Sequence, residues 1–137
     1  MRKRYQLSTL ISLRLIFSLI CCSLVGSSYS QLSGTYSIGG TGSHYSTINE
    51  AVNALNTQGV NGPVVFKINS GIYYEQILIG EVAGSSSTNT ITFESTSGNA
   101  EEVILTYGAN NAVDNYIIHF TNASNIILRN LSFEVSG

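Results

Sequence analysis

The stretch VVFKINSGIYYEQILI, residues 64–79, decides how this chain folds. Two short runs in it, residues 64–68 and 76–79, are rich in Val, Ile and Phe, which fit the pleated surface of a β-strand. Asn69, Ser70 and Gly71 stand between the runs, and these residue types form turns. The stretch therefore predicts two short strands that are joined through a turn.

Runs of the same kind recur along the chain after Pro63, and turn formers separate them. They are VVFKI (64–68), QILI (76–79), TITFE (90–94), VILTY (103–107), YIIHF (116–120), NIIL (125–128) and LSFEV (131–135). The pairs Phe66/Ile68, Ile91/Phe93 and Ile118/Phe120 follow one another at intervals of 25 to 27 residues, and Ile77/Ile79 and Val103/Leu105 repeat a step of 26. A repeat of this length indicates stacked units of strands.

Two folds accommodate such a repeat, namely a β-solenoid and a sandwich of hairpins. Hairpins favour two-residue Asn-Gly or Asp-Gly turns, but the Asn-Gly at 61–62 precedes the first of these runs. We therefore predict an all-β fold, a right-handed parallel β-helix, with residues 91–93 stacked in parallel on 66–68. A hairpin between residues 90–94 and 103–107 would contradict this prediction. The residues predicted to point inward are Phe66, Ile68, Ile77, Ile79, Ile91, Phe93, Val103, Leu105, Leu131 and Phe133.

One segment has a helical period instead. Ile48, Ala51, Val52 and Leu55 are spaced to form one apolar stripe, which predicts a helix at about residues 47–58. Thr47 and Glu50 have the spacing of a capping box, and a glycine follows the helix at position 59. Because an open solenoid end exposes strand edges and core, we expect this helix to cap the N-terminal end.

The first residues resemble a secretory signal. Arg2, Lys3 and Arg4 precede an apolar segment that runs to Val25, and small residues follow up to Ser30. The segment is too short for a comfortable membrane span, so the membrane is met only through a signal peptide that is then cleaved. We expect three parts: a signal peptide at 1–30, an N-terminal capping segment at 31–62, and the first β-helix coils at 63–137.

Removal of that signal changes the composition. Both cysteines lie within it, and the remaining chain has two basic residues, Lys67 and Arg129, against eight acidic ones, a net charge of −6. Nucleic acid needs clustered Lys and Arg, so it is an unfavourable partner. A secreted chain without cysteine has to gain its stability from a repetitive hydrogen-bonded core.

Several motifs resemble the N-terminal part of pectin-lyase-like proteins, above all pectinesterases and bacterial secreted β-helix proteins. The motifs are YSTINEAVNAL (45–55), PVVFKINSGIYYEQILIG (63–80), TITFES (90–95) and NIILRNLSF (125–133), so the resemblance covers most of residues 35–137. It implies a β-helix in which Tyr73 and Glu75 are structural residues. Esterases and hydrolases of this fold use a pair of aspartates on later coils, whereas this chain has one aspartate, Asp114.

Glu75 has two interpretations. As a carboxylate beside a glycine turn, it can accept backbone N–H groups that are left open where the chain bends. As a general acid, it would need a second carboxylate at a defined distance, and none follows it closely. We favour the structural role. His119 is expected on the outer face, and Arg129 is expected in an ion pair with Glu134 or with a neighbouring coil. We assign no catalytic, cofactor-binding or metal-binding residue.

Four tyrosines are candidates to contact a glycan: Tyr73, Tyr74, Tyr107 and Tyr116. Aromatic faces stack on the apolar faces of sugars, but tyrosine is equally normal in strands. The leading hypothesis is a secreted or cell-surface, non-catalytic β-helix module that binds a polysaccharide or the extracellular matrix. The alternative is the N-terminal fragment of a carbohydrate-active enzyme such as a pectinesterase or polysaccharide lyase. A solenoid that stops at EVSG leaves its last coil open, so we expect a truncated chain.

Overall fold

The computed structural model describes residues 30–108 and 115–135. The expected signal peptide, with Cys21 and Cys22, and the aspartate Asp114 lie outside the described residues. In the part of the chain that is described, no helix combines the length and the apolar character needed to cross a membrane.

The described chain consists of short strands and one α-helix, as expected for the all-β class. The elements are β1 (Leu32–Ile38), α2 (Ile48–Gln58), β2 (Val60–Ile68), β3 (Gly71–Tyr74), β4 (Ile77–Ile79), β5 (Ile91–Ser95), the 3₁₀ turn η1 (Ala100–Glu102), β6 (Val103–Tyr107), β7 (Ile118–Phe120), β8 (Ile126–Arg129) and β9 (Ser132–Val135). Each predicted run contains a strand. The strands β1 and β3 were not among those runs, because glycine and polar residues interrupt both segments.

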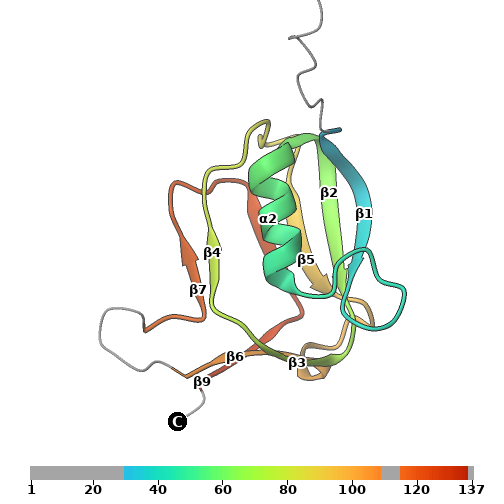
Figure 1. The fold of residues 1–137 in the computed structure, drawn as a ribbon, viewed down its shortest axis with the longest axis vertical. Helices are drawn as coiled ribbons and strands as arrows, with labels where there is room; N and C mark the ends of the chain where they lie inside the picture. The colour runs from blue at the N-terminus through green and yellow to red at the C-terminus, as the bar shows by residue number, and fades with distance from the viewer. Residues whose placement is uncertain (1–29, 109–114, 136–137) are drawn as a thin grey trace, which may run out of the picture.

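The strands form three parallel sheets, which we name sheet A (β1-β2-β5-β8), sheet B (β3-β6-β9) and sheet C (β4-β7). From β2 onward the chain passes through sheets A, B and C in turn, then repeats that order (Figure 1). Phe66 of β2 pairs in parallel with Phe93 of β5, so the predicted stacking of these segments is confirmed. The alternative hairpin is not formed, since β5 and β6 belong to different sheets.

The predicted repeat of 25 to 27 residues is wrong about which later strands stack. Ile118 pairs with Ile77 of sheet C, not with Ile91, and Val103 pairs with Gly71 of sheet B, not with Ile77. The cause is the unequal length of the connections between strands. A constant spacing along the sequence therefore does not correspond to a constant position in space.

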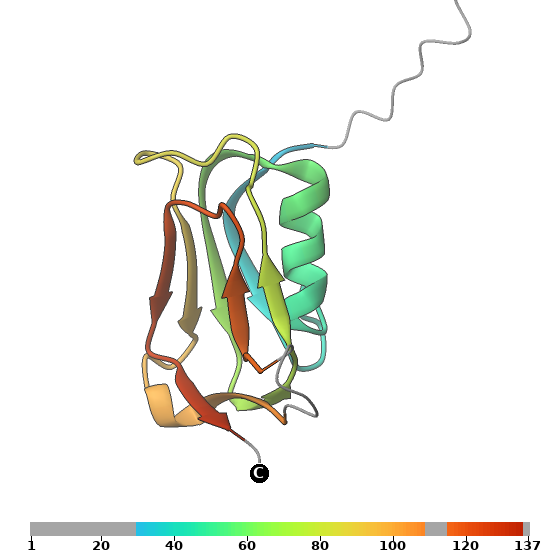
Figure 2. The ribbon, with the colours of Figure 1, turned by 90° about the vertical axis from the view of Figure 1, so that its left-hand side faces the viewer.

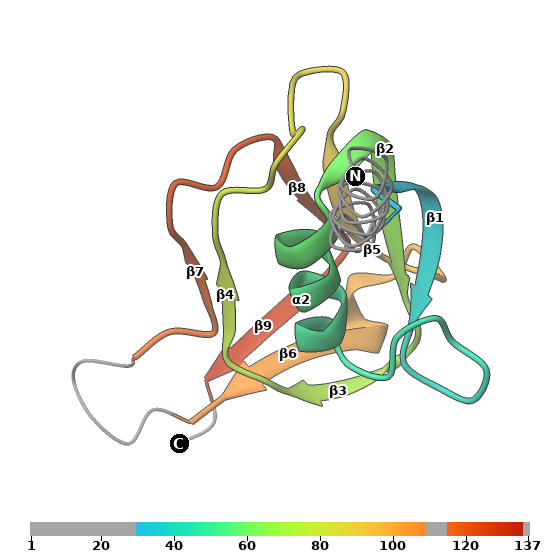
Figure 3. The same cartoon turned by 45° about the horizontal axis from the view of Figure 1, so that its top comes forward.

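The helix expected at 47–58 is present as α2, and its apolar stripe is buried. Ile48 and Leu55 are among the fully buried residues. Thr47 accepts the Glu50 backbone N–H through its side chain (N···O 3.1 Å), and Gly59 ends the helix with a φ of 66°. The helix lies over one end of the space that the strands enclose, between β4 and β1 (Figures 1 and 3). That end of the core is therefore covered.

The core confirms most of the predicted inward residues. Eight of the ten are at most 2% exposed: Phe66, Ile68, Ile77, Ile79, Ile91, Phe93, Val103 and Leu105. The rings of Phe66 and Phe93 stack with centroids 4.8 Å apart. Leu131 is only partly buried, and Phe133 is 46% exposed, so the prediction is wrong for Phe133. Phe133 pairs with Leu105 on one side, but no described strand lies on its other side.

Candidate functional site: an aromatic pocket at the end face

The end of the molecule opposite α2 presents apolar residues to solvent. We call it the end face and define it by the inward-facing residues of the last strands, Ile118, Phe120, Ile126, Leu128, Phe133 and Val135. Among the described residues, β7, β8 and β9 are each the outermost strand of a sheet. Figure 2 shows β8 and β9 on the side of the molecule away from α2. Strands in this position leave one row of backbone N–H and C=O groups without a strand partner.

An open pocket of about 390 Å³ lies at the corner of the end face where sheets B and C meet. Its lining consists of Tyr107, Asn115, Tyr116, Ile117, Ile118, Leu128, Phe133 and Val135. This volume falls within the range of about 300–1,000 Å³ that is usual for small-molecule sites. The mixture of aromatic and aliphatic side chains with a few polar groups is also usual for such sites.

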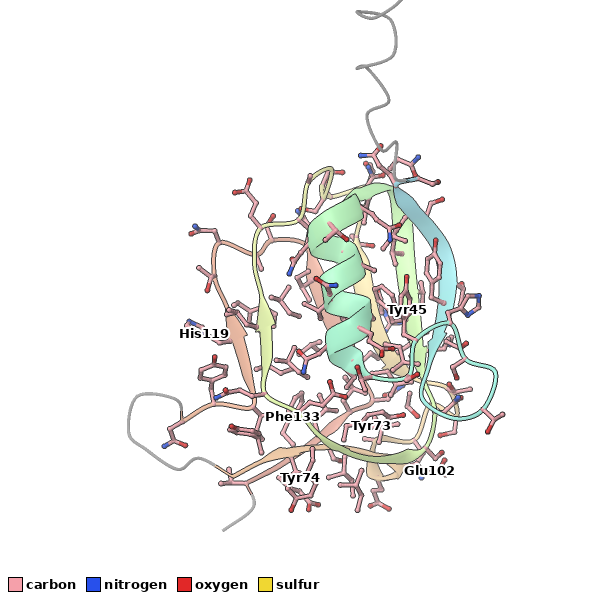
Figure 4. The ribbon with its side chains drawn as sticks, in the orientation of Figure 1. Tyr45, Tyr73, Tyr74, Glu102, His119 and Phe133 are labelled. Atoms are coloured by element: carbon pink, nitrogen blue, oxygen red, sulfur yellow. The ribbon has the colours of Figure 1, made fainter. Side chains whose placement is uncertain are left out.

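The structure brings two of the four candidate tyrosines together. Tyr107 ends β6, and Tyr116 lies shortly before β7, yet both line the pocket. The Tyr116 ring also contacts the His119 ring edge-on, with centroids 5.0 Å apart. His119 is exposed, as the alternation in its strand predicts (Figure 4). The pocket therefore joins aromatic groups from two sheets.

Tyr73 and Tyr74 are not part of the pocket. The Tyr73 hydroxyl donates to the Asn69 carbonyl oxygen (O···O 2.8 Å), and its ring packs on the core. Burial raises the pKa of Tyr73, and the negative charge of Glu75 raises it further. Tyr74 points away from the core and is 69% exposed (Figure 4). The structure thus gives Tyr73 a packing role and places Tyr74 on a separate surface.

Glu75 holds the first turn of the helix. Its carboxylate accepts the backbone N–H of Ile48 (N···O 3.0 Å) through Oε1 and that of Asn49 (N···O 2.8 Å) through Oε2. The N–H groups at the start of a helix have no partner within the helix, and a negative charge there is favoured by the helix dipole. The structural interpretation of Glu75 is supported, but the groups it holds belong to the helix, not to the bend of its own segment.

Other charged residues also have structural partners. Glu94 lies between Lys67 and Arg129 on the outer face of sheet A, with N···O distances of 2.7 Å and 3.4 Å. Arg129 therefore pairs with a neighbouring strand, which was one of its two expected partners. Glu102 accepts a hydrogen bond from the Ser70 hydroxyl (O···O 2.8 Å), and hydrogen bonds from Ser70, Ser97 and Asn99 lower the pKa of Glu102.

Metal-ligand residues do not gather in the described part of the chain. Residues 30–108 and 115–135 contain no group of three or more His, Cys, Asp or Glu side chains suited to a metal ion. The pocket lining likewise contains tyrosine and asparagine as its polar residues. The site offers stacking surfaces and hydrogen-bonding groups, and these are the elements of a binding site.

The sequence alone did not indicate most of the pocket. Leu128, Phe133 and Val135 read as ordinary residues of strands, and Phe133 was expected inside the core. They line a pocket because they belong to the outermost described strands. No local pattern carries that information.

No known protein family and no curated protein matches the chain. Among solved structures, a pectin methylesterase from Aspergillus niger is similar, with a TM-score of 0.54 and 19% sequence identity. The match covers 77% of this chain and 36% of that chain. At this identity the likeness concerns the fold alone. The chain is thus a mostly-β protein with parallel sheets and one α-helix, loosely similar to the pectin-lyase-like β-helix fold.

Proposed function

We propose that this chain is a secreted or cell-surface module with a right-handed parallel β-helix fold, which binds a glycan and does not catalyse a reaction. The passage of the chain through three parallel sheets in a repeating order supports the β-helix. The similarity to the pectin methylesterase structure supports it as well. The signal-like residues 1–30 support secretion.

The pocket that joins Tyr107 and Tyr116 is the observation that carries this proposal. The C–H groups on one face of a sugar ring form an apolar surface, and an aromatic ring is a matching surface for it. The two phenolic hydroxyls and the amide of Asn115 supply hydrogen-bond donors and acceptors for the sugar hydroxyls. A pocket of about 390 Å³ has room for one or two sugar rings.

The roles of the glutamates support a binding module without catalysis. A glycosidase-type mechanism needs a pair of carboxyl groups on opposite sides of the scissile bond. Glu75 is bound by the amides of α2, and Glu94 is bound by two cationic side chains. Neither residue lines the aromatic pocket.

The second candidate is that these residues form the N-terminal part of a carbohydrate-active enzyme, similar to a pectinesterase or a polysaccharide lyase. The likeness to a pectin methylesterase favours this candidate. A gene that continues into coils with an aspartate pair, or with acidic metal ligands beside a lysine or arginine, would support it. The two candidates therefore differ in sequence that can be read directly.

The test is glycan binding by the full chain, first on a glycan array and then by calorimetry with each oligosaccharide that binds. The double variant Tyr107→Leu/Tyr116→Leu is expected to lose at least about tenfold in affinity, equivalent to about 1.4 kcal/mol. Tyr74→Leu is the matched control, because Tyr74 is exposed and lies outside the pocket. Unchanged binding by the double variant would rule out this pocket as the site. Pectin de-esterification or eliminative cleavage that Glu75→Gln abolishes in a folded protein would favour the enzyme.

A further inference from the structure

The aromatic pocket has no charged residue in its lining. Its polar residues are Tyr107, Asn115 and Tyr116, and the others are aliphatic or aromatic. Carboxylates in proteins are usually recognised by Arg, Lys or several N–H donors that converge on the two oxygens. The lining presents no Arg or Lys to a ligand.

The basic residues beyond residue 30 are engaged elsewhere. Lys67 and Arg129 are the only two in that part of the sequence, and both pair with Glu94 on the outer face of sheet A. Paired residues on one strand pair point to the same face, so Lys67, Glu94 and Arg129 form one row across β2, β5 and β8. Leu128 lines the pocket, whereas the adjacent Arg129 belongs to that outer row, because side chains alternate along a strand.

The charge of the whole chain acts in the same direction. Residues 31–137 carry a net charge of −6, with eight acidic residues. A field of this sign lowers the local concentration of anionic ligands and slows their association. An anionic sugar would also lose hydration at the apolar surface of Leu128 and Phe133 without gaining a cationic partner.

We infer, on the basis of the proposed glycan-binding function, that the aromatic pocket selects uncharged sugar residues and discriminates against uronates. A neutral hexose places its C–H face on the aromatic and aliphatic lining, and its hydroxyls bond to the tyrosines and Asn115. A C6 carboxylate on the same sugar meets an apolar surface and a negative field. The selectivity therefore depends on what the pocket lacks, a cation, as much as on the aromatic rings.

The test uses matched pairs of oligosaccharides that differ only at C6. Each neutral hexose oligomer that binds the full chain is compared by calorimetry with its counterpart in which C6 is oxidised to a carboxylate. We expect the carboxylate form to bind at least about tenfold more weakly. The affinity of the neutral form should change little between about 0.05 M and 0.5 M salt, because no ion pair is formed.

A charge-introducing variant makes the test independent of folding losses. Val135 lines the pocket and is 75% exposed, so Val135→Lys is expected to fold and to raise the affinity for the carboxylate form by about tenfold. Ile72→Lys is the control, since Ile72 is 66% exposed and lies outside the pocket.

The outcomes separate this inference from the proposed function. Equal or tighter binding of the carboxylate form overturns the selectivity and leaves glycan binding intact. If neither form of any oligosaccharide binds, the proposed function fails and the selectivity fails with it. An equal gain for Val135→Lys and Ile72→Lys would assign the discrimination to the overall charge alone, which contradicts a pocket that selects by its lining.

Discussion

The two ends of this molecule contain the same kinds of residues in very different environments. Leu105 and Phe133 are paired partners in sheet B, yet they are 2% and 46% exposed. Phe93 and Leu128 are paired partners in sheet A, yet they are 2% and 36% exposed. In each pair the residue with strands on both sides is buried, and its partner on the outermost strand is not. Burial here is set by the next layer, not by the residue or its strand.

The covered end owes its closure to a helix whose polar groups are satisfied. The apolar stripe of α2 packs on the core, while Glu75 and Thr47 accept the first backbone N–H groups of the helix. A helix that met the core without such partners would leave buried donors unpaired, at a cost of about 1–3 kcal/mol each. The end face has no equivalent element among the described residues, and there the aromatic pocket is found.

The largest effect is expected from the same truncation made at the two ends. Phe66→Ala removes a fully buried ring that stacks on Phe93 and should lower the free energy of unfolding by about 3–5 kcal/mol. Phe133→Ala removes a ring that is already 46% exposed and should cost about 1 kcal/mol. Denaturant unfolding of both variants measures the difference. Equal losses would mean that the end face is as well packed in solution as the covered end.

A second comparison concerns two glycines in the connection between β4 and β5. Gly84 has a φ of +85°, and a Cβ there would collide with the Val60 carbonyl oxygen. Gly84→Ala should therefore cost about 2–4 kcal/mol, from the left-handed backbone and the displaced β2. Gly80→Ala is the control, because a Cβ at Gly80 meets open space. Thermal unfolding checks this, and a Gly84→Ala protein as stable as Gly80→Ala would contradict the close approach.

Loss of the carboxylate at the covered end gives an intermediate effect. Glu75→Gln leaves one acceptor oxygen where two N–H groups are now satisfied, and it removes the charge at the helix N-terminus. We expect a loss of about 1–3 kcal/mol in the free energy of unfolding. Glu134→Gln, at an exposed residue of β9, should change stability by less than about 0.5 kcal/mol. Hydrogen exchange at Ile48 and Asn49 should accelerate in the first variant only.

The smallest effect is expected for the charged row on sheet A, which spans both ends. The pair of Lys67 and Glu94 (2.7 Å) involves a lysine with a 40% exposed side chain, and Arg129 is 59% exposed. Double-mutant cycles with Lys67→Met, Arg129→Met and Glu94→Gln should give coupling energies of about 0.2–1 kcal/mol, reduced by added salt. A coupling that salt leaves unchanged would indicate that the row is shielded from solvent.

Much of the local structure followed from sequence patterns. The helix was predictable because apolar spacing, an N-cap threonine and a terminal glycine agree with one another at positions 47–59. The inward residues of β2, β4, β5 and β6 were predictable because side chains alternate along a strand. The strands β1 and β3 were missed because neither segment alternates apolar and polar residues: LSGTYSI is largely polar, and GIYY begins with glycine.

The sequence by itself determined that this chain forms short parallel strands with one helix, and that Glu75 accepts backbone hydrogen bonds. These are consequences of side-chain spacing and residue type, which act over a few residues. Only the tertiary structure decided that Ile118 stacks on Ile77, that Tyr107 meets Tyr116, and that Phe133 is exposed. The physical reason is that connections of unequal length set which strands become neighbours, and that a side chain is buried only when a further layer covers it.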